Sequence, residues 1–306
     1  MLIIELLIIL ISVTGLWVGA IWVVESASTI AKKLGLSELV IGLTVVAIAT
    51  SAPEFAVTVS AALRGQTSIS VGNVVGSNIF NLGFILGLVA IFSGIATNKI
   101  LIKRDGSLLL FTSLLLLIFF YDLNLSVVEG IILTAILIIY VSVLIIKKEK
   151  IEEGVPAGIF KWYDIPKLIF GVAAIIISAN FLVDSATILA RNIGVSEWII
   201  GITIVAGGTS VPELATSMVA VYKGRYGISA GNLIGSDLFN MLGVLGVAAI
   251  LNPLNITENE YISMYLMMGS IVVLLFLMRG GWRISKRDGI VLILISIFRW
   301  SFDFIF

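Results

Sequence analysis

The chain has 306 residues, of which 59% are hydrophobic and only 12% are charged, whereas a soluble domain carries about 25% charged residues. So much apolar surface does not fit in one water-soluble core, so we expect an integral membrane protein surrounded by lipid. Lys and Arg balance Asp and Glu at 19 each, which excludes the basic excess of a nucleic-acid-binding protein.

The sequence contains no cysteine and no histidine. Disulfides, thiolate metal sites and imidazole chemistry are therefore excluded. Any metal ion bound by this chain must take oxygen ligands, which favours hard cations such as Na⁺, Ca²⁺ or Mg²⁺. We expect no organic cofactor.

Ten apolar segments of about 20 residues follow one another along the chain. The first lacks the basic start and the small-residue cleavage site of a signal peptide, so it is predicted to be a mature membrane helix. A polar linker at 148–163 separates a first half, 1–147, from a second half, 164–306. The predicted spans are 2–24, 38–63, 69–95, 106–121, 126–147, 164–190, 197–222, 228–251, 261–278 and 288–305.

The basic residues predict the orientation in the cell membrane. With ten spans, sixteen Lys and Arg residues fall on the side that holds the linker, and three fall on the other side. The positive-inside rule makes the first side cytoplasmic, which places both termini outside.

The two halves repeat each other. The segment 40–91 aligns with 199–250 without a gap, at an offset of 159 residues. Because each half has an odd number of spans, the second must enter the membrane from the opposite side. The sequence therefore predicts an all-α, polytopic membrane protein of ten transmembrane helices, arranged as two inverted five-helix repeats.

Each repeat carries polar residues on two neighbouring spans. The first cluster reads "ATSAPE" at 49–54 and "GTSVPE" at 208–213, where a proline removes a backbone donor and frees carbonyls of the preceding turn. The second cluster follows about 25 residues later, one helical turn separating its serine from its asparagine. The candidate cation ligands are Ala47, Thr50, Ser51, Glu54, Ser77, Asn81, Ala206, Thr209, Ser210, Glu213, Ser236 and Asn240, with Asp237 as a further candidate.

Glu54 and Glu213 carry most of this functional hypothesis. A charge at the bilayer centre costs at least ~2.5–3.5 kcal/mol, so a glutamate there indicates function. Two carboxylates balance one Ca²⁺ or about two monovalent ions, and competition for them is a simple basis for ion exchange. Single Ser, Thr and Gly residues more often serve backbone bonding and helix packing. Glu25 and Asp184, near span ends, are expected to be interfacial charges.

These motifs resemble the alpha-repeats of the cation/Ca²⁺ exchanger superfamily, and most closely those of archaeal-type Na⁺/Ca²⁺ exchangers. The resemblance implies antiport by alternating access, with Ca²⁺ held by Glu54, Glu213 and the carbonyls of Thr50 and Thr209. It also implies a central site completed by Asn81 and Asn240. The flanking Na⁺ sites would use Ala47, Ser51, Ser77, Ala206, Ser210 and Ser236.

Two positions depart from the family pattern. Ala49 replaces a usual glycine, and Asn240 replaces an aspartate found in some relatives, including K⁺-dependent ones. The "GNVVG" and "GNLIG" segments lack the second glutamate of the cation/proton branch, which counts against Ca²⁺/H⁺ exchange.

Three alternatives stay open. Ca²⁺/H⁺ antiport could use the same glutamates, and a cation channel could also line its pore with carboxylates. An intramembrane enzyme is disfavoured because neither cluster has a nearby lysine, histidine or cysteine. The expected partners are Ca²⁺, Na⁺ and the lipid bilayer, and we expect a functional monomer.

Overall fold

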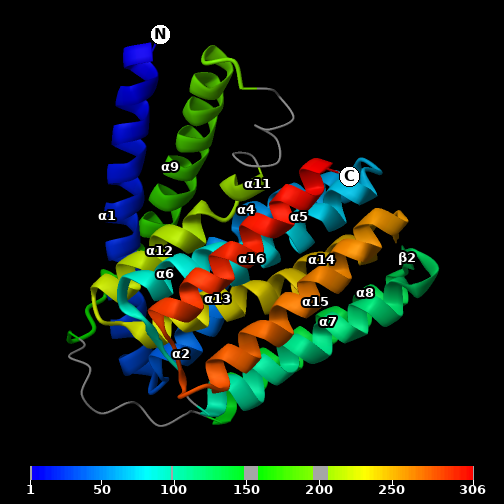
Figure 1. Cartoon of the computed structure of the whole chain (residues 1–306). Helices are drawn as coiled ribbons and strands as arrows, with labels where there is room; N and C mark the ends of the chain where they lie inside the picture. The colour runs from blue at the N-terminus through cyan, green and yellow to red at the C-terminus, as the bar shows by residue number, and fades with distance from the viewer. Residues whose placement is uncertain (1, 98, 148–157, 196–205, 306) are drawn as a thin grey trace. The chain divides into compact units, whose positions relative to one another are not determined.

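The computed structural model describes residues 2–97, 99–147, 158–195 and 206–305 (Figure 1). Within these ranges the chain is helical apart from loops and four two-residue strands, which confirms the predicted all-α class. Seven of the described helices are long and apolar enough to cross a membrane, or eight if the broken pair 38–63 counts as one span.

The first half of the chain contains helices of ordinary α-type, short π-helical stretches (η1, η2, η3), one 3₁₀ turn (η4) and two strands. Its elements are α1 (Leu2–Leu34), α2 (Glu38–Ile41), η1 (Gly42–Val46), α3 (Ala47–Thr50), α4 (Ala52–Leu63), α5 (Thr67–Ile79), η2 (Phe80–Ile85), α6 (Leu86–Ser93), β1 (Ile95–Ala96), η3 (Leu101–Gly106), α7 (Ser107–Phe119), η4 (Phe120–Asp122), β2 (Asn124–Leu125) and α8 (Val127–Lys147).

The second half repeats this order. Its described elements are α9 (Asp164–Asn192), α11 (Ala206–Gly208), α12 (Val211–Tyr222), α13 (Tyr226–Phe239), η6 (Asn240–Val244), α14 (Leu245–Leu251), β3 (Leu254–Asn255), α15 (Glu258–Arg279), β4 (Arg283–Ile284) and α16 (Lys286–Ile305). Residues 148–157 of the predicted linker and 197–205 of the seventh predicted span lie outside the described residues.

Helix α1 is longer than the sequence pattern indicated. The predicted span ended at residue 24, whereas the helix continues to Leu34. Lys32 and Lys33 lie in its last turn, where positive charge interacts favourably with the helix dipole. Gly35 follows with a φ of 68°, the left-handed conformation that commonly ends a helix. The helix therefore ends at a cap and not at the edge of its apolar stretch.

The chain divides into two compact units, and each combines segments from both halves. Unit 1 comprises residues 1–53 and 147–232, and unit 2 comprises residues 54–146 and 233–306. Adding the repeat offset of 159 to 1–53 gives 160–212, which also lies in unit 1. The first 53 residues and their equivalents in the second repeat therefore belong to the same unit.

In unit 1, the first helices of the two repeats, α1 and α9, lie side by side (Figure 1). A Cβ added at Gly19 would lie 2.9 Å from the Gly171 carbonyl oxygen, and one at Gly171 would lie 3.0 Å from that of Gly19. Gly15, one turn earlier in α1, faces Ser178, which comes later in α9 than Gly171. The two helices are antiparallel and approach closely because small residues line their contact.

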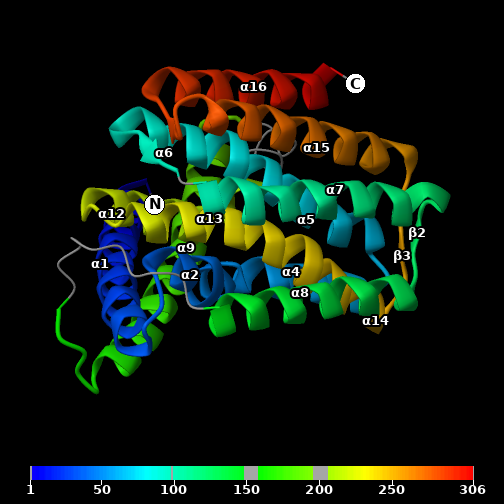
Figure 2. The same ribbon diagram turned by 90° about the horizontal axis from the view of Figure 1, so that it is seen from below.

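In unit 2, α16 runs along α6 and α15 runs along α7 (Figure 2). A Cβ at Gly87 would lie 2.8 Å from the Gly289 carbonyl oxygen. At the equivalent pair in the other repeat, a Cβ at Gly130 would lie 2.7 Å from the Gly246 carbonyl oxygen. Adding 159 turns 87 into 246 and 130 into 289, so the same glycine contact is made twice.

The short strands in unit 2 show the same duplication. Strand β1 pairs antiparallel with β4, Ile95 opposite Ile284, and β2 pairs with β3, Leu125 opposite Leu254. Adding 159 to 95–96 gives 254–255, and adding it to 124–125 gives 283–284. Each ribbon therefore joins the two repeats through equivalent residues.

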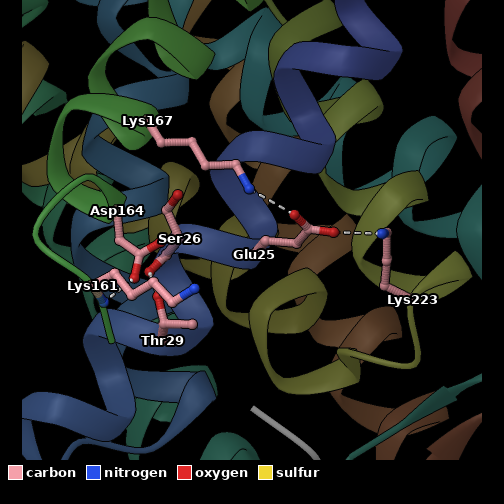
Figure 3. Close-up of polar contacts among 7 residues, drawn as sticks. All are labelled: Glu25, Ser26, Thr29, Lys161, Asp164, Lys167 and Lys223. Atoms are coloured by element: carbon pink, nitrogen blue, oxygen red, sulfur yellow. Dashed lines mark hydrogen bonds and ion pairs between the residues drawn. The ribbon is translucent and has the colours of Figure 1, made fainter. Parts of the chain in front are cut away.

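A partly exposed charge cluster lies in unit 1 around Glu25, in the C-terminal part of α1 (Figure 3). Glu25 accepts hydrogen bonds from Lys167 Nζ at 2.8 Å and from Lys223 Nζ at 2.6 Å. The Glu25 side chain is 41% exposed, and its position at the membrane interface stays a prediction. The two lysines come from α9 and from the residue after α12, so this carboxylate bridges three segments of the unit.

We expect Glu25→Gln to change the free energy of unfolding by less than about 1 kcal/mol, because solvent screens an exposed ion pair. Thermal unfolding of the purified protein in detergent, at low and at high salt, measures this change. A loss larger than about 3 kcal/mol would show that the cluster behaves as a buried charge network instead.

Candidate functional site

The two proline-containing motifs form broken helices. Helix α3 ends at Thr50, Ser51 leaves the helical conformation at ψ 12°, and α4 begins at Ala52. In the second repeat α11 ends at Gly208, Ser210 has a ψ of 5°, and α12 begins at Val211. The prolines are the second residues of the new helices, where a missing N–H leaves no helical hydrogen bond unmade.

These breaks place Glu54 and Glu213 in the first turns of α4 and α12. Both side chains are completely buried. The unsatisfied N–H groups at a helix N-terminus carry partial positive charge and stabilise a nearby carboxylate. The broken helix thus offsets part of the cost of burying each glutamate.

In unit 1, residues from the two repeats meet at Glu213. Ser51 Oγ donates a hydrogen bond to Glu213 Oε1 at 2.9 Å. Thr50 Oγ1 donates to Asn232 Oδ1 at 2.9 Å, and the Asn232 amide donates to Ser217 Oγ at 3.0 Å. Thr50, Ser51 and Glu213, all predicted from sequence, therefore belong to one buried hydrogen-bonded cluster.

Asn73 and Asn232 were not among the candidate ligands predicted from the sequence, although both belong to the "GN" pairs of the repeated motif. Asn232 Nδ2 donates to the backbone oxygen of Glu213 at 3.4 Å, and Asn73 Nδ2 donates to that of Glu54 at 3.3 Å. Asn73 also donates to Thr58 Oγ1 at 3.0 Å, the equivalent of the Ser217 contact. Each asparagine thus binds the backbone of the helical turn that carries a glutamate. The repetition of the "GN" pair in both halves was the sequence signal that could have identified this role.

In unit 2, four amide and carboxylate side chains form a second buried cluster. Asn81 Nδ2 donates to Asp237 Oδ1 at 3.1 Å, and Asn240 Nδ2 donates to Asn78 Oδ1 at 3.1 Å. The two bonds are equivalent, since 81 and 78 become 240 and 237 after adding 159. Asn81 lies in η2 and Asn240 begins η6, and π-helical stretches of this kind are frequent at functional sites.

The remaining predicted residues lie close along the chain to these clusters. Ser77, Ser210 and Ser236 are buried, whereas Thr209 is partly exposed. The Ala47 carbonyl accepts a hydrogen bond from the Ser51 amide at 3.0 Å. Ala206 begins α11, directly after the undescribed segment 196–205.

The chemistry of both clusters is that of oxygen ligands. Among the described residues, no three Asp or Glu side chains gather closely enough to hold a metal ion by carboxylates alone. Asn81 Oδ1 and Asn240 Oδ1 are buried and accept no hydrogen bond within the described part of the chain. Amide, hydroxyl and carboxylate oxygens are the ligands that Ca²⁺ and other hard cations prefer.

Comparison with known proteins gives a consistent result over nearly the whole chain. The family described as sodium/calcium exchanger protein matches residues 4–146 and 165–298. The sodium/calcium exchanger MaX1 of Methanosarcina acetivorans is 34% identical, with 97% of each chain covered. The putative antiporter CaxA of Alkalimonas amylolytica is also 34% identical, with 90% of each chain covered.

A solved structure of the sodium-calcium exchanger NCX_Mj, soaked with zero Na⁺ and Ca²⁺, resembles the fold. Its TM-score is 0.85 and its sequence identity 30%, and the match covers 97% of this chain and 98% of that one.

Proposed function

The chain belongs to the sodium/calcium exchanger family, and from this premise we propose that it exchanges Na⁺ for Ca²⁺ across the cell membrane by alternating access. Members of this family are transporters and not enzymes, and several helices of the chain are suited to a membrane. One observation carries the proposal furthest. Ser51 of the first repeat donates a hydrogen bond to the buried carboxylate of Glu213 in the second, inside a cluster of oxygen donors.

The proposed architecture is ten membrane helices in two inverted repeats, residues 1–147 and 164–306, joined by a cytoplasmic linker at 148–163. The antiparallel packing of α1 against its repeat equivalent α9 supports it, because an axis in the membrane plane reverses the direction of equivalent helices. The duplicated glycine contacts and strand pairs support it as well. The excess of basic residues on the side of the linker supports an orientation with both termini outside.

We propose that Glu54 and Glu213 share the transported Ca²⁺, assisted by the carbonyls of Thr50 and Thr209. Asn81 and Asn240 would complete the central site. The two repeats would contribute equivalent oxygen ligands to the Na⁺ sites. The proposed Na⁺ ligands are Ala47, Ser51, Ser77, Ala206, Ser210 and Ser236.

Exchange follows from charge balance in this proposal. Two carboxylates need about two positive charges, which either one Ca²⁺ or a set of Na⁺ ions supplies. An empty site would leave buried charge uncompensated, which is costly in a low-dielectric environment. Loaded states of either kind are therefore the ones able to reorient, and transport in one direction requires the other ion to return.

We expect ⁴⁵Ca²⁺ uptake into proteoliposomes to require Na⁺ inside the vesicles and to scale with the outward Na⁺ gradient. A pH gradient imposed without Na⁺ should give no uptake, because the chain lacks the second glutamate of the proton-coupled motif. Uptake that follows the pH gradient and ignores Na⁺ would replace this proposal with Ca²⁺/H⁺ antiport. An ohmic current without saturable counter-transport would indicate a channel instead.

A further inference from the structure

The amide oxygens of Asn81 and Asn240 form a matched pair in unit 2. Both side chains have no solvent exposure, and neither Oδ1 accepts a hydrogen bond within the described residues. Leaving a buried polar atom unsatisfied costs about 1–3 kcal/mol, and the structure does so at two equivalent positions. Such oxygens are suited to a cation that supplies the missing positive partner.

The nitrogen of each amide is held by the other repeat. Asn81 Nδ2 donates to the Asp237 carboxylate at 3.1 Å, and Asn240 Nδ2 donates to Asn78 Oδ1 at 3.1 Å. Asn78 is itself held, because its Nδ2 donates to the backbone oxygen of Asp237 at 3.2 Å. Both chains of hydrogen bonds therefore end at Asp237, one at its side chain and one at its carbonyl.

These contacts decide which end of each amide points away from the cluster. A carboxylate oxygen accepts hydrogen bonds, so turning Asn81 over would set its Oδ1 against Asp237 Oδ1 and lose the bond. Asn78 is fixed in the same way, since its Nδ2 is the only end that can bond a carbonyl. Asn78 then offers Oδ1 to Asn240, which must present Nδ2 to it and turn its own Oδ1 outward.

We propose that Asp237 is a positioning residue for the cation site: its carboxylate orients Asn81, and its backbone carbonyl orients Asn78 and through it Asn240, so that two amide oxygens face Ca²⁺. This inference rests on the proposed function and adds to it a role for a residue that the motif left open. Equivalent positions carry Asn78 and Asp237, so the repeats share the hydrogen-bond pattern but only one of them supplies a carboxylate. The aspartate contributes its acceptor atoms, and the cation ligands are the two asparagines.

Two substitutions at this position separate the acceptor from the charge. Asp237→Leu keeps the branched shape of the side chain and removes the acceptor, so Asn81 loses its fixed orientation, whereas Asp237→Asn keeps an oxygen where Oδ1 lies. We expect Asp237→Leu to weaken equilibrium ⁴⁵Ca²⁺ binding to the purified full chain about 10- to 100-fold, the range for a lost hydrogen bond to a charged group. Asp237→Asn should stay within about fivefold of the unchanged protein.

A double-mutant cycle with Asn81→Ala tests the route of the effect. If Asp237 acts through Asn81, Asp237→Leu should weaken Ca²⁺ binding much less in the Asn81→Ala background than alone. Ser229→Ala serves as the matched control, because this serine is buried on the same helix and its hydroxyl makes no hydrogen bond within the described residues. It should bind Ca²⁺ as the unchanged protein does, and gel filtration in detergent verifies that each variant is folded.

Each other outcome overturns a specific statement. Equal weakening by the leucine and asparagine variants would make the charge of Asp237 itself the binding determinant. Independent, additive effects in the cycle, or unchanged binding by Asp237→Leu, would exclude positioning through Asn81. Absence of ⁴⁵Ca²⁺ binding by the unchanged protein would instead contradict the proposed function, so the two failures are distinguishable.

Discussion

Replacing Glu213 with glutamine is expected to lower Ca²⁺ transport at least about a hundredfold while leaving the protein folded. The substitution removes one of two buried negative charges. Even at an effective dielectric constant of 20, two opposite unit charges 4 Å apart attract each other by about 4 kcal/mol. A divalent ion that loses one carboxylate partner loses more binding free energy than this. The glutamine keeps an oxygen that can still accept the hydrogen bond from Ser51 Oγ, so the local packing has no reason to change.

Na⁺-driven ⁴⁵Ca²⁺ uptake into proteoliposomes measures this effect. Glu25→Gln is the matched control, because it makes the same chemical change at a glutamate that is 41% exposed and bound to two lysines. Glu54→Gln should behave like Glu213→Gln, since the two residues are repeat equivalents. Near-normal exchange in either site variant would refute the assignment of the glutamates to the cation site.

Replacing Gly231 with valine is expected to destabilise unit 1 by about 3 kcal/mol or more, or to prevent folding. A Cβ at this position of α13 would lie 2.6 Å from the Leu39 carbonyl oxygen and 2.8 Å from the Leu43 amide nitrogen. Both are backbone atoms of the α2–η1 helix, so no side-chain rotation relieves the overlap. From the other side, a Cβ at Gly42 would lie 2.8 Å from the Ile228 carbonyl oxygen.

The yield of monodisperse protein in detergent and its thermal stability measure this change. Gly269→Val in α15 is the control, because a Cβ at Gly269 meets no atom within 4 Å and the helical propensity changes in the same way. Stability of Gly231→Val equal to that of the control would show that the two helices can separate at little cost. Asn232 is the next residue and bonds Thr50 and the backbone of Glu213, so a displaced helix should also weaken Ca²⁺ binding.

Most helices could be predicted from the sequence because their signals are local. Long apolar stretches, and prolines two residues after a serine, identified where helices begin and break. The end of α1 was predicted too early, because the apolar length of a membrane span indicated residue 24, whereas Lys33 and Gly35 determine where the helix stops. The π-helical stretches at η2 and η6 had no distinct sequence signal, since their residues also suit an ordinary α-helix.

The sequence predicts that this chain lies in a membrane, that its halves are duplicates and that Glu54 and Glu213 have a function. These predictions depend on composition, on a fixed offset and on the cost of burying charge, and none of them requires knowing how the helices pack. The hydrogen-bond partners are known from the folded chain alone: Ser51 with Glu213, Thr50 with Asn232, and Asp237 with Asn81. The physical reason is distance along the chain. A helical position predicts which neighbours share its own face, but hydrogen bonds between residues more than 150 positions apart depend on how separate helices pack.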